Sequence, residues 1–320
     1  DLLEWGEKHI DEVDLLLPGI GKRGRWLAKQ IPWVENVSAA VFSETIPSEA
    51  AHTVWQTGRK AARLFLLRRL RKTDPVLALD LTASSWSEEP AEERAEFLEA
   101  FKIGLSMVDE PFLEASLDDR SKEVRKIAAD VLAHLAQSRL VQRQTLRAQA
   151  LLKFKAGGFL RKAQIEVVLP EQCDKEMIRD GVNVKPAITN GLGEKGEWLL
   201  QILRMVPPSI WSKQWGKSPS DLMEIAADGD WKKLLHEGWI TATIKHQDPE
   251  WAEAILKIEP RRSLLFNALP PQRRLAFLIS QIQTRPLEGM ELLFSYSEPW
   301  GIDLTRLALR HMRTYYLKSN

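Results

Sequence analysis

Cysteine is almost absent: Cys173 is the one thiol in 320 residues. A disulfide needs two thiols and a structural zinc site commonly uses several, so the composition excludes an intrachain disulfide framework and a multi-cysteine zinc site. A single cysteine also fits a reducing compartment. We therefore expect a cytoplasmic protein.

Long apolar runs and a charge imbalance are missing too. The longest apolar runs fall far short of the ~20 residues that a membrane-spanning helix needs, so we expect no membrane partner. Asp1–Ile10 is acidic and mixed in character and shows no signal peptide. The chain begins without methionine, which favours a fragment of a longer protein. Forty-five basic and 44 acidic side chains give a net charge of +1, which excludes a global field directed at nucleic acid.

Catalytic and metal-binding patterns are also absent. The six histidines are scattered and form no H-E-x-x-H, and no G-x-S-x-G nucleophile motif occurs. Gly19–Gly24 and Gly191–Gly196 both match G-x-G-x-x-G, but neither follows a predicted strand, so we interpret both as turns. Cys173 is followed by Asp174 and Glu176, whose charges oppose thiolate formation. We expect a protein that is not an enzyme and holds no metal and no cofactor.

What the sequence does contain is a helical hairpin between Asp109 and Leu135. Pro111 suits a first helical turn, and Asp109 can cap the helix that begins there. The pair Asp118–Asp119 stands where the second helix needs its cap. That helix carries one apolar stripe, formed by Val124, Ile127, Ala128, Val131, Leu132 and Leu135. One hairpin cannot bury such a stripe alone, so the pattern predicts neighbouring hairpins on either side.

Similar patterns recur along the chain. Arg63-x-x-x-Leu67 and Arg94-x-x-x-Leu98 lie 31 residues apart, a period typical of helical-hairpin repeats. We predict an all-α protein, an α-solenoid of antiparallel helix pairs, with one irregular insertion near 156–193. Within the insertion, the β-branched residues of 163–169 favour a short strand.

This organisation predicts four segments. Residues 1–52 form an irregular helical segment, residues 53–155 the first helical repeats, residues 156–193 the insertion or linker, and residues 194–320 the C-terminal repeats. Single helices are predicted at Val54–Leu70 and at Ser138–Leu152.

A segment without acidic residues gives the sharpest binding signal. No Asp or Glu occurs between Val131 and Ile165. Its seven cations form a candidate binding ridge: Arg139, Arg143, Arg147, Lys153, Lys155, Arg161 and Lys162. The first three follow i, i+4, i+8 spacing on one helix, where like charges destabilise by ~0.2–0.5 kcal/mol per pair. Either carboxylates on adjacent helices offset this, or an acidic partner or a nucleic-acid backbone does.

A secondary basic cluster precedes the ridge and is predicted to join it on a concave face. It consists of Arg59, Lys60, Arg63, Arg68, Arg69, Arg71 and Lys72. The twelve tryptophans, among them Trp211 and Trp215 at i, i+4, predict packing between helices. The alternative for these rings is a groove that stacks on a peptide or on bases.

Several of these stretches together resemble a bacterial family. They are Val54-Trp-Gln-Thr-Gly58, Leu66-Leu-Arg-Arg-Leu70, Trp86–Arg94, Asp109–Leu135 with Ser138-Arg-Leu140, and Gly191–Lys195 with Val206-Pro207-Pro208 and Trp211. The resemblance covers most of residues 50–300 and is strongest at 86–140. It is to a HEAT-like domain of unknown function, and it implies HEAT-like repeats but no catalytic residues. Members are longer than this chain, in keeping with a fragment. Their genes neighbour those of SWIM zinc-finger proteins, MoxR-type AAA ATPases and von Willebrand A-domain proteins, which implies protein partners.

Two functions follow as expectations. The first is a non-catalytic scaffold that binds partner proteins, such as a MoxR-type ATPase or a SWIM zinc-finger protein, on a curved face. The alternative is a helical-repeat protein that binds nucleic acid through the candidate binding ridge and the secondary basic cluster.

Overall fold

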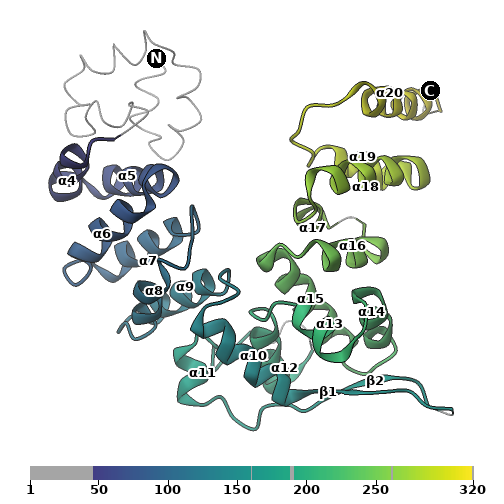
Figure 1. Ribbon diagram of the computed structural model, residues 1–320, viewed down its shortest axis with the longest axis horizontal. Coiled ribbons are helices and arrows are strands. Elements are labelled where there is room, and N and C mark those ends of the chain that lie inside the picture. The colour runs from purple at the N-terminus through teal and green to yellow at the C-terminus, as the bar shows by residue number, and fades with distance from the viewer. Residues whose placement is uncertain (1–45, 160, 188–190, 261, 319–320) are drawn as a thin grey trace. The chain divides into compact units, whose positions relative to one another are not determined.

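The computed structural model describes residues 46–318, except 160, 188–190 and 261 (Figure 1). Within these residues the regular secondary structure is helical apart from one two-stranded antiparallel sheet. The predicted all-α fold with a small β insertion is therefore confirmed. The Gly19–Gly24 turn and most of the predicted segment 1–52 lie outside the described residues.

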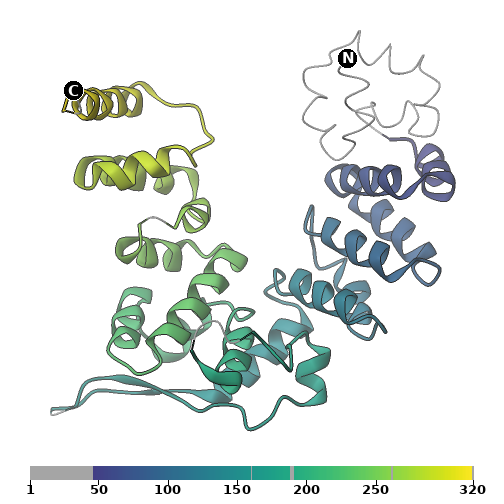
Figure 2. The ribbon, with the colours of Figure 1, turned by 180° about the vertical axis from the view of Figure 1, so that it is seen from behind.

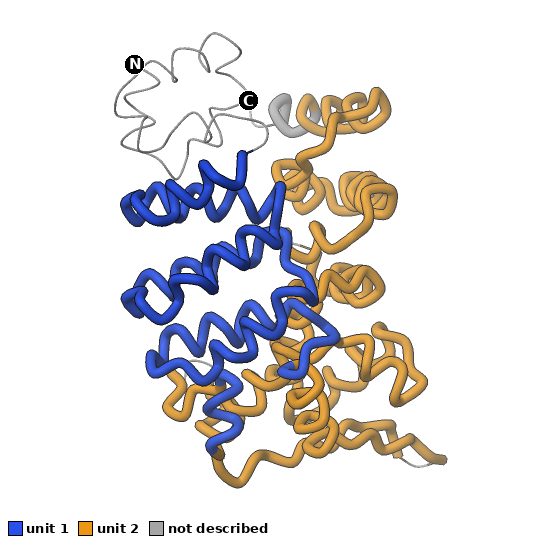
Figure 3. Tube along the Cα trace, turned by 60° about the vertical axis from the view of Figure 1, so that its left-hand side comes forward, with its two compact units in different colours: residues 1–140, 175–181 blue, residues 141–174, 182–320 orange. Residues whose placement is uncertain are grey.

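The chain divides into two compact units, shown in Figure 3. The first holds the residues up to 140 together with 175–181, and the second holds 141–174 and the residues from 182 onward. Residues of the predicted insertion, 156–193, therefore fall in both units. The first unit contains α4 (Ser48–Thr57), α5 (Lys60–Thr73), α6 (Pro75–Ser85), α7 (Ala91–Ala100), α8 (Glu110–Ser116), α9 (Lys122–Leu132) and α11 (Lys175–Arg179).

The helices of the first unit pack as antiparallel pairs. Helix α5 packs on α7, and α7 on α9, while α4 and α6 lie against α5 and α8 lies against α9. The core between them is apolar and fully buried at Leu66, Leu67, Phe97, Phe101 and Leu132. The predicted stripe on α9 contributes to this core, which explains why the hairpin needs neighbours.

One predicted helix is in fact two. The interval Val54–Leu70 is broken at Gly58, where the backbone leaves the helical region with ψ 148°. A Cβ at Gly58 would lie 2.4 Å from the carbonyl oxygen of Val54, so the close turn requires glycine. The sequence pattern concealed this break because apolar residues continue on both sides of it.

The second unit begins within α10 (Arg139–Leu151), whose first two residues belong to the first unit. Its strands are β1 (Leu152–Lys155) and β2 (Gln164–Val167). Its other helices are α12 (Gly193–Leu203), α13 (Ser209–Trp215), α14 (Pro219–Ala227), α15 (Lys232–His246), α16 (Pro249–Ile258), α17 (Ser263–Asn267), α18 (Pro271–Thr284), α19 (Pro286–Leu293) and α20 (Ile302–Lys318).

The strand predicted within 163–169 is confirmed as β2, but its partner β1 was not predicted. Leu152 pairs with Val167, and the ladder continues to Lys155 opposite Gln164. The predicted helix Ser138–Leu152 ends one residue early, and the chain runs directly into β1. A strand of four residues is too short for its sequence pattern to be distinguished from the end of a helix.

Helices of the second unit pack on one another through tryptophan. Helix α15 packs on α12, α14, α16 and α17, and α18 packs on α19 and α20. Trp211, Trp239 and Trp251 are fully buried, and the rings of Trp239 and Trp251 meet edge to face with centroids 5.1 Å apart. These rings serve inter-helix packing, as predicted. In the described part of the chain, no helix combines the length and the apolar character needed to cross a bilayer.

Candidate binding surfaces

The secondary basic cluster lies on α5 and at its N-cap, and its members differ widely in exposure. Arg59 and Lys72 are exposed, Lys60, Arg63, Arg68 and Arg69 are half-buried, and Arg71 is completely buried. The cluster therefore does not form one continuous exposed surface, because Arg71 is buried and Arg63 is half-buried.

Arg71 is the most deeply bound of these cations. Its Nη1 and Nη2 donate to the two carboxylate oxygens of Asp109 at 2.8 and 2.7 Å. Its Nε and Nη2 also donate to the carbonyl oxygens of Ile103 and Gly104, both at 2.9 Å. The guanidinium lies over the Phe101 ring, 4.4 Å from its centroid. All of these contacts lie inside the protein, and Arg71 has no exposed surface with which to bind a phosphate.

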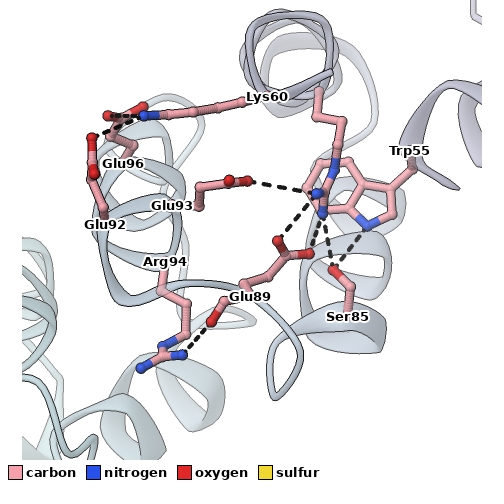
Figure 4. Close-up of polar contacts among 9 residues, drawn as sticks. Trp55, Lys60, Ser85, Glu89, Glu92, Glu93, Arg94 and Glu96 are labelled. Atoms are coloured by element: carbon pink, nitrogen blue, oxygen red, sulfur yellow. Dashed lines mark hydrogen bonds and ion pairs between the residues drawn. The ribbon is translucent and has the colours of Figure 1, made fainter. Parts of the chain in front are cut away.

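Arg63 forms a second such centre, and its partners Trp55, Ser85 and Glu89 are labelled in Figure 4. Its Nη1 donates to Glu89 Oε2 at 3.1 Å, and its Nη2 binds the other oxygen of the same carboxylate. The guanidinium lies over Trp55 at 4.5 Å, and Trp55 Nε1 donates to Ser85 Oγ at 3.1 Å. Burial alone would raise the pKa of Glu89, but hydrogen bonds from Arg63 and Ser85 outweigh it and lower that pKa.

Lys60 lies at the outer end of the same region. Its Nζ binds Glu96 Oε1 at 2.6 Å and Glu92 Oε1 at 3.3 Å on α7 (Figure 4). The hydrogen bond to Glu96, together with the one to Glu92, raises the pKa of Lys60. Ion pairs as exposed as these contribute little to stability. The Lys60 side chain is partly exposed to solvent.

The arrangement around Arg63 recurs at two further positions. In each set an aromatic residue stands eight positions before an arginine, and a carboxylate stands 24–26 positions after it. The ring lies 4.5–5.8 Å below the guanidinium, and the carboxylate forms an ion pair with it. The three sets are Trp55–Arg63–Glu89, Trp86–Arg94–Asp119 and Phe266–Arg274–Glu298. We call this set the aromatic–arginine–carboxylate module.

The prediction that the side chains of Asp109, Asp118 and Asp119 cap helices is wrong, because each binds an arginine instead. Asp119 receives Arg94 Nε at 2.9 Å, and Asp118 receives Arg179 Nε at 2.7 Å. Asp109 accepts from Arg71 and makes no capping bond to its own helix. The cap of α9 is Ser121, whose Oγ accepts from the N–H of Val124. Asp109 and Asp119 each lie beside a buried guanidinium, where a carboxylate gains more than at a solvated helix end. The pair of Asp118 with Arg179 lies at the surface.

The candidate binding ridge is split between two elements. Arg139, Arg143 and Arg147 lie on α10, as predicted, and Arg139 is held by Glu110: its Nε donates to Oε1 at 2.8 Å and its backbone N–H to the same oxygen at 3.2 Å. Arg143 and Arg147 are half-buried. For Arg139, therefore, a carboxylate of a neighbouring helix offsets the like charges along α10.

The remaining ridge residues lie on the β1–β2 hairpin. Lys153 and Lys155 occupy its solvent face, and Arg161 and Lys162 lie beyond the strands toward the tip. Lys155 Nζ meets Glu166 Oε2 at 3.1 Å, and Lys162 Nζ meets Asp228 Oδ2 at 2.7 Å. Within the described residues, Lys153 and Arg161 form no ion pair. The secondary basic cluster lies in the first unit and these four cations in the second.

The surroundings of His236 and Cys173 shift the pKa of each side chain. His236 is buried, and its Nε2 lies 3.1 Å from the carbonyl oxygen of Met223; burial lowers its pKa. Burial and Asp174 raise the pKa of Cys173, which disfavours the thiolate. In the part of the chain that the structure describes, no group of three or more His, Cys, Asp and Glu side chains is arranged to hold a metal ion.

Sequence reasoning missed the role of Trp55 and Trp86. The 31-residue offset between Arg63 and Arg94 was visible, and these tryptophans share that offset. Glu89 and Asp119, which follow those arginines by 26 and 25 residues, complete the signal. Nothing in a single sequence marks which carboxylate lies opposite an arginine, so this pairing needed the structure.

Comparison with known protein families gives a match over nearly the whole chain. The family model described as "Family of unknown function (DUF5691)" matches residues 1–319. The chain belongs to this family. No curated protein and no solved structure matches it significantly. The family therefore assigns no activity, and the proposals below rest on residues of this chain.

Proposed function

We propose that this DUF5691 protein is a non-catalytic helical-repeat scaffold that binds a partner protein. The observation that carries the proposal is a set of exposed apolar side chains on its last helices. Half of the large apolar residues that are exposed in the described chain lie after residue 257. They are Ile258, Leu264, Leu287, Phe294, Trp300, Ile302 and Leu309.

The spacing of these residues is that of helix faces. Leu287 lies on α19 and Phe294 is the residue that ends it, seven positions on; Ile302 and Leu309 on α20 have the same separation. Residues seven apart lie on one side of a helix. Both helices are buried along another side, at Leu292 and Leu293 on α19 and at Leu304 and Ala308 on α20. Two helices with an apolar side left in water are typical of surfaces that bind other proteins.

The basic residues favour the same conclusion over the nucleic-acid alternative. Arg63, Arg71 and Arg139 each bind a carboxylate of this chain, so they contribute no net charge toward a phosphate backbone. A nucleic-acid surface gains affinity by neutralising phosphates with cations that are otherwise hydrated. The secondary basic cluster supplies few of these.

The family resemblance supplies the partner class for this scaffold. We propose a MoxR-type AAA ATPase or a SWIM zinc-finger protein as the partner, in the reducing cytoplasm that a single cysteine fits. Either protein would be purified from the same organism and mixed with the intact chain, and binding would be measured by isothermal titration calorimetry. We expect a complex with one of them that the double substitution Leu287→Asp with Phe294→Asp weakens at least tenfold.

The matched control is Phe159→Asp, which changes the other strongly exposed phenylalanine of the second unit. It should leave the affinity for the protein partner unchanged. Circular dichroism and the melting temperature establish that each variant is folded. Absence of binding by both candidate partners at tens of micromolar, or equal weakening by Phe159→Asp, would contradict the proposal.

A further inference from the structure

The β1–β2 hairpin presents the most exposed apolar side chain in the described part of the molecule. Phe159 has a relative exposure of 104%. It lies at the tip, where Gly158 and Arg161 close the turn with backbone hydrogen bonds in both directions. Figures 1 and 2 show the hairpin extending well past the neighbouring helices of its unit. None of the described residues of the second unit covers this ring.

The base of the hairpin, in contrast, is firmly packed. Leu152 and Phe154 point to one face of the ladder, where Leu152 is buried and Phe154 stacks on Trp215 at 5.8 Å. Trp215 in turn contacts the buried Trp211 at 4.9 Å. The ion pair between Lys162 and Asp228, at the turn after α14, adds a contact nearer the tip. The tip therefore projects from a fixed base and does not belong to a loose loop.

The opposite face and the tip are cationic. Side chains alternate along a strand, so Lys153 and Lys155 share the outer face. Arg161 ends the turn and Lys162 follows it. The segment 152–167 carries four cations and one acidic residue, Glu166, which pairs with Lys155. Asp228, which pairs with Lys162, and Asp230 line the same hollow as Arg161 and Lys162. Lys153 and Arg161 are exposed and form no ion pair with the described residues.

We propose that this hairpin binds single-stranded nucleic acid, a function beyond protein scaffolding. Phe159 stacks on an unpaired base, and Arg161 in the same turn contacts a phosphate next to that base. Lys153, six residues before Phe159 on β1, contacts a phosphate further along the nucleic-acid strand. An aromatic ring combined with nearby cations is what single-strand binding uses, because every base offers a π face and every linkage a negative charge. Binding by stacking and phosphate contacts is tolerant of sequence.

The same features argue against two other partners. A membrane anchor needs a large apolar area, and here one phenylalanine stands among four cations. A protein interface commonly surrounds its aromatic anchor with further apolar contacts. Around Phe159 the described neighbours are Gly157, Gly158, Arg161 and Lys162, which offer charge and backbone, and Leu160 lies outside the described residues.

The test is fluorescence anisotropy with the intact chain and a fluorescein-labelled 15-nucleotide oligo-dT or oligo-U at ~50 mM salt, where phosphate contacts are strongest. We expect Phe159→Ala to weaken binding about tenfold and Phe159→Trp to preserve it, as base stacking predicts. Phe294→Ala, the matched control on an exposed phenylalanine, should bind like the wild type. Because neither side chain is packed, all three variants should fold.

Salt dependence tests the phosphate contacts separately. A single-strand contact changes the slope of log K against log salt by about 0.7. Arg161→Glu and Lys153→Glu should each reduce the slope by about that amount, and Lys126→Glu on α9 should not. The proposal is overturned if the wild type fails to bind at ~50 mM salt or if Phe159→Ala and Phe294→Ala bind equally. Phe159-dependent sedimentation with phosphatidylserine vesicles, without binding to the oligonucleotides, would also overturn it. Loss of the protein partner through Leu287→Asp with Phe294→Asp leaves these outcomes unaffected.

Discussion

Helix α5 and the β1–β2 hairpin are both rich in cations, yet the two regions differ in how deeply those cations are buried. On α5, Arg63 and Arg71 turn inward and bind Glu89 and Asp109. On the hairpin, Lys153 and Arg161 face water. The difference lies in what stands opposite: the antiparallel helix pairs bring acidic residues against α5, whereas a two-stranded ladder has few neighbours. Local basic composition is therefore a poor guide to a binding surface in a helical-repeat protein.

The largest expected effect comes from breaking the buried pair on α5. Arg71→Met leaves the Asp109 carboxylate and the carbonyls of Ile103 and Gly104 without their donor. We expect a loss of about 3–5 kcal/mol in the free energy of unfolding of the first unit, as for other broken buried pairs. Hydrogen exchange of peptides from α5 to α8 measures it. Lys72→Met, on the exposed side of the same helix, is the control; a loss below about 1 kcal/mol in Arg71→Met would refute the assignment.

The aromatic–arginine–carboxylate module gives the next effect. Arg63→Met should cost about 2–3 kcal/mol, since it removes charged hydrogen bonds to the buried Glu89. A double-mutant cycle with Glu89→Gln should show a coupling of about 1–2 kcal/mol. Arg94→Met with Asp119→Asn should behave alike if the sets are equivalent. Purely additive changes at both sets would mean that the shared spacing has no energetic consequence.

Acid should affect the two units in different pH ranges. Burial lowers the pKa of His236 below 6.5, so as pH falls below that value the unfolded chain takes up a proton that the folded chain refuses. The second unit then loses stability by at most about 1.4 kcal/mol per pH unit from this group. The pKa of Glu89 is lowered, so its stabilisation of the first unit is complete above about 4.5, the ordinary value, and is lost as pH falls below it.

Calorimetric melting between pH 5 and 7 measures the first of these effects. His236→Gln should flatten the pH dependence in that range, whereas Glu89→Gln should alter it only below about pH 4.5. An unchanged slope in His236→Gln would show that another group controls the acid response.

The smallest expected effect is at the hairpin tip. Phe159→Ser should change the free energy of unfolding by less than about 0.5 kcal/mol, because the ring is fully exposed. Phe154→Ser, at the packed base, should cost more because it removes the stack on Trp215. Chemical denaturation of both variants provides the comparison, and a large loss in Phe159→Ser would mean that the tip is packed.

The sequence predicted the helices better than it predicted which strands and which charged side chains pair. The stripe on α9 was correct because periodic apolar residues have one low-energy arrangement, with that side buried. The break at Gly58 and the strand β1 were not predicted, since each involves too few residues to produce a period. Asp118 and Asp119 were misinterpreted as caps, because the guanidiniums that bind them come from helices remote in the chain.

For this protein the sequence by itself determined the fold class: stripes at helical spacing, separated by proline and glycine turns, require helices that pack in pairs. It also determined where cations concentrate. Only the tertiary structure decided which cations are internal and which are displayed, because an ion pair depends on distances between elements that lie tens of residues apart. Arg71 and Arg161 are the same residue type, and Asp109 stands beside one of them. That pair, together with the Phe101 ring and the carbonyls of Ile103 and Gly104, separates a core residue from a candidate ligand-binding one.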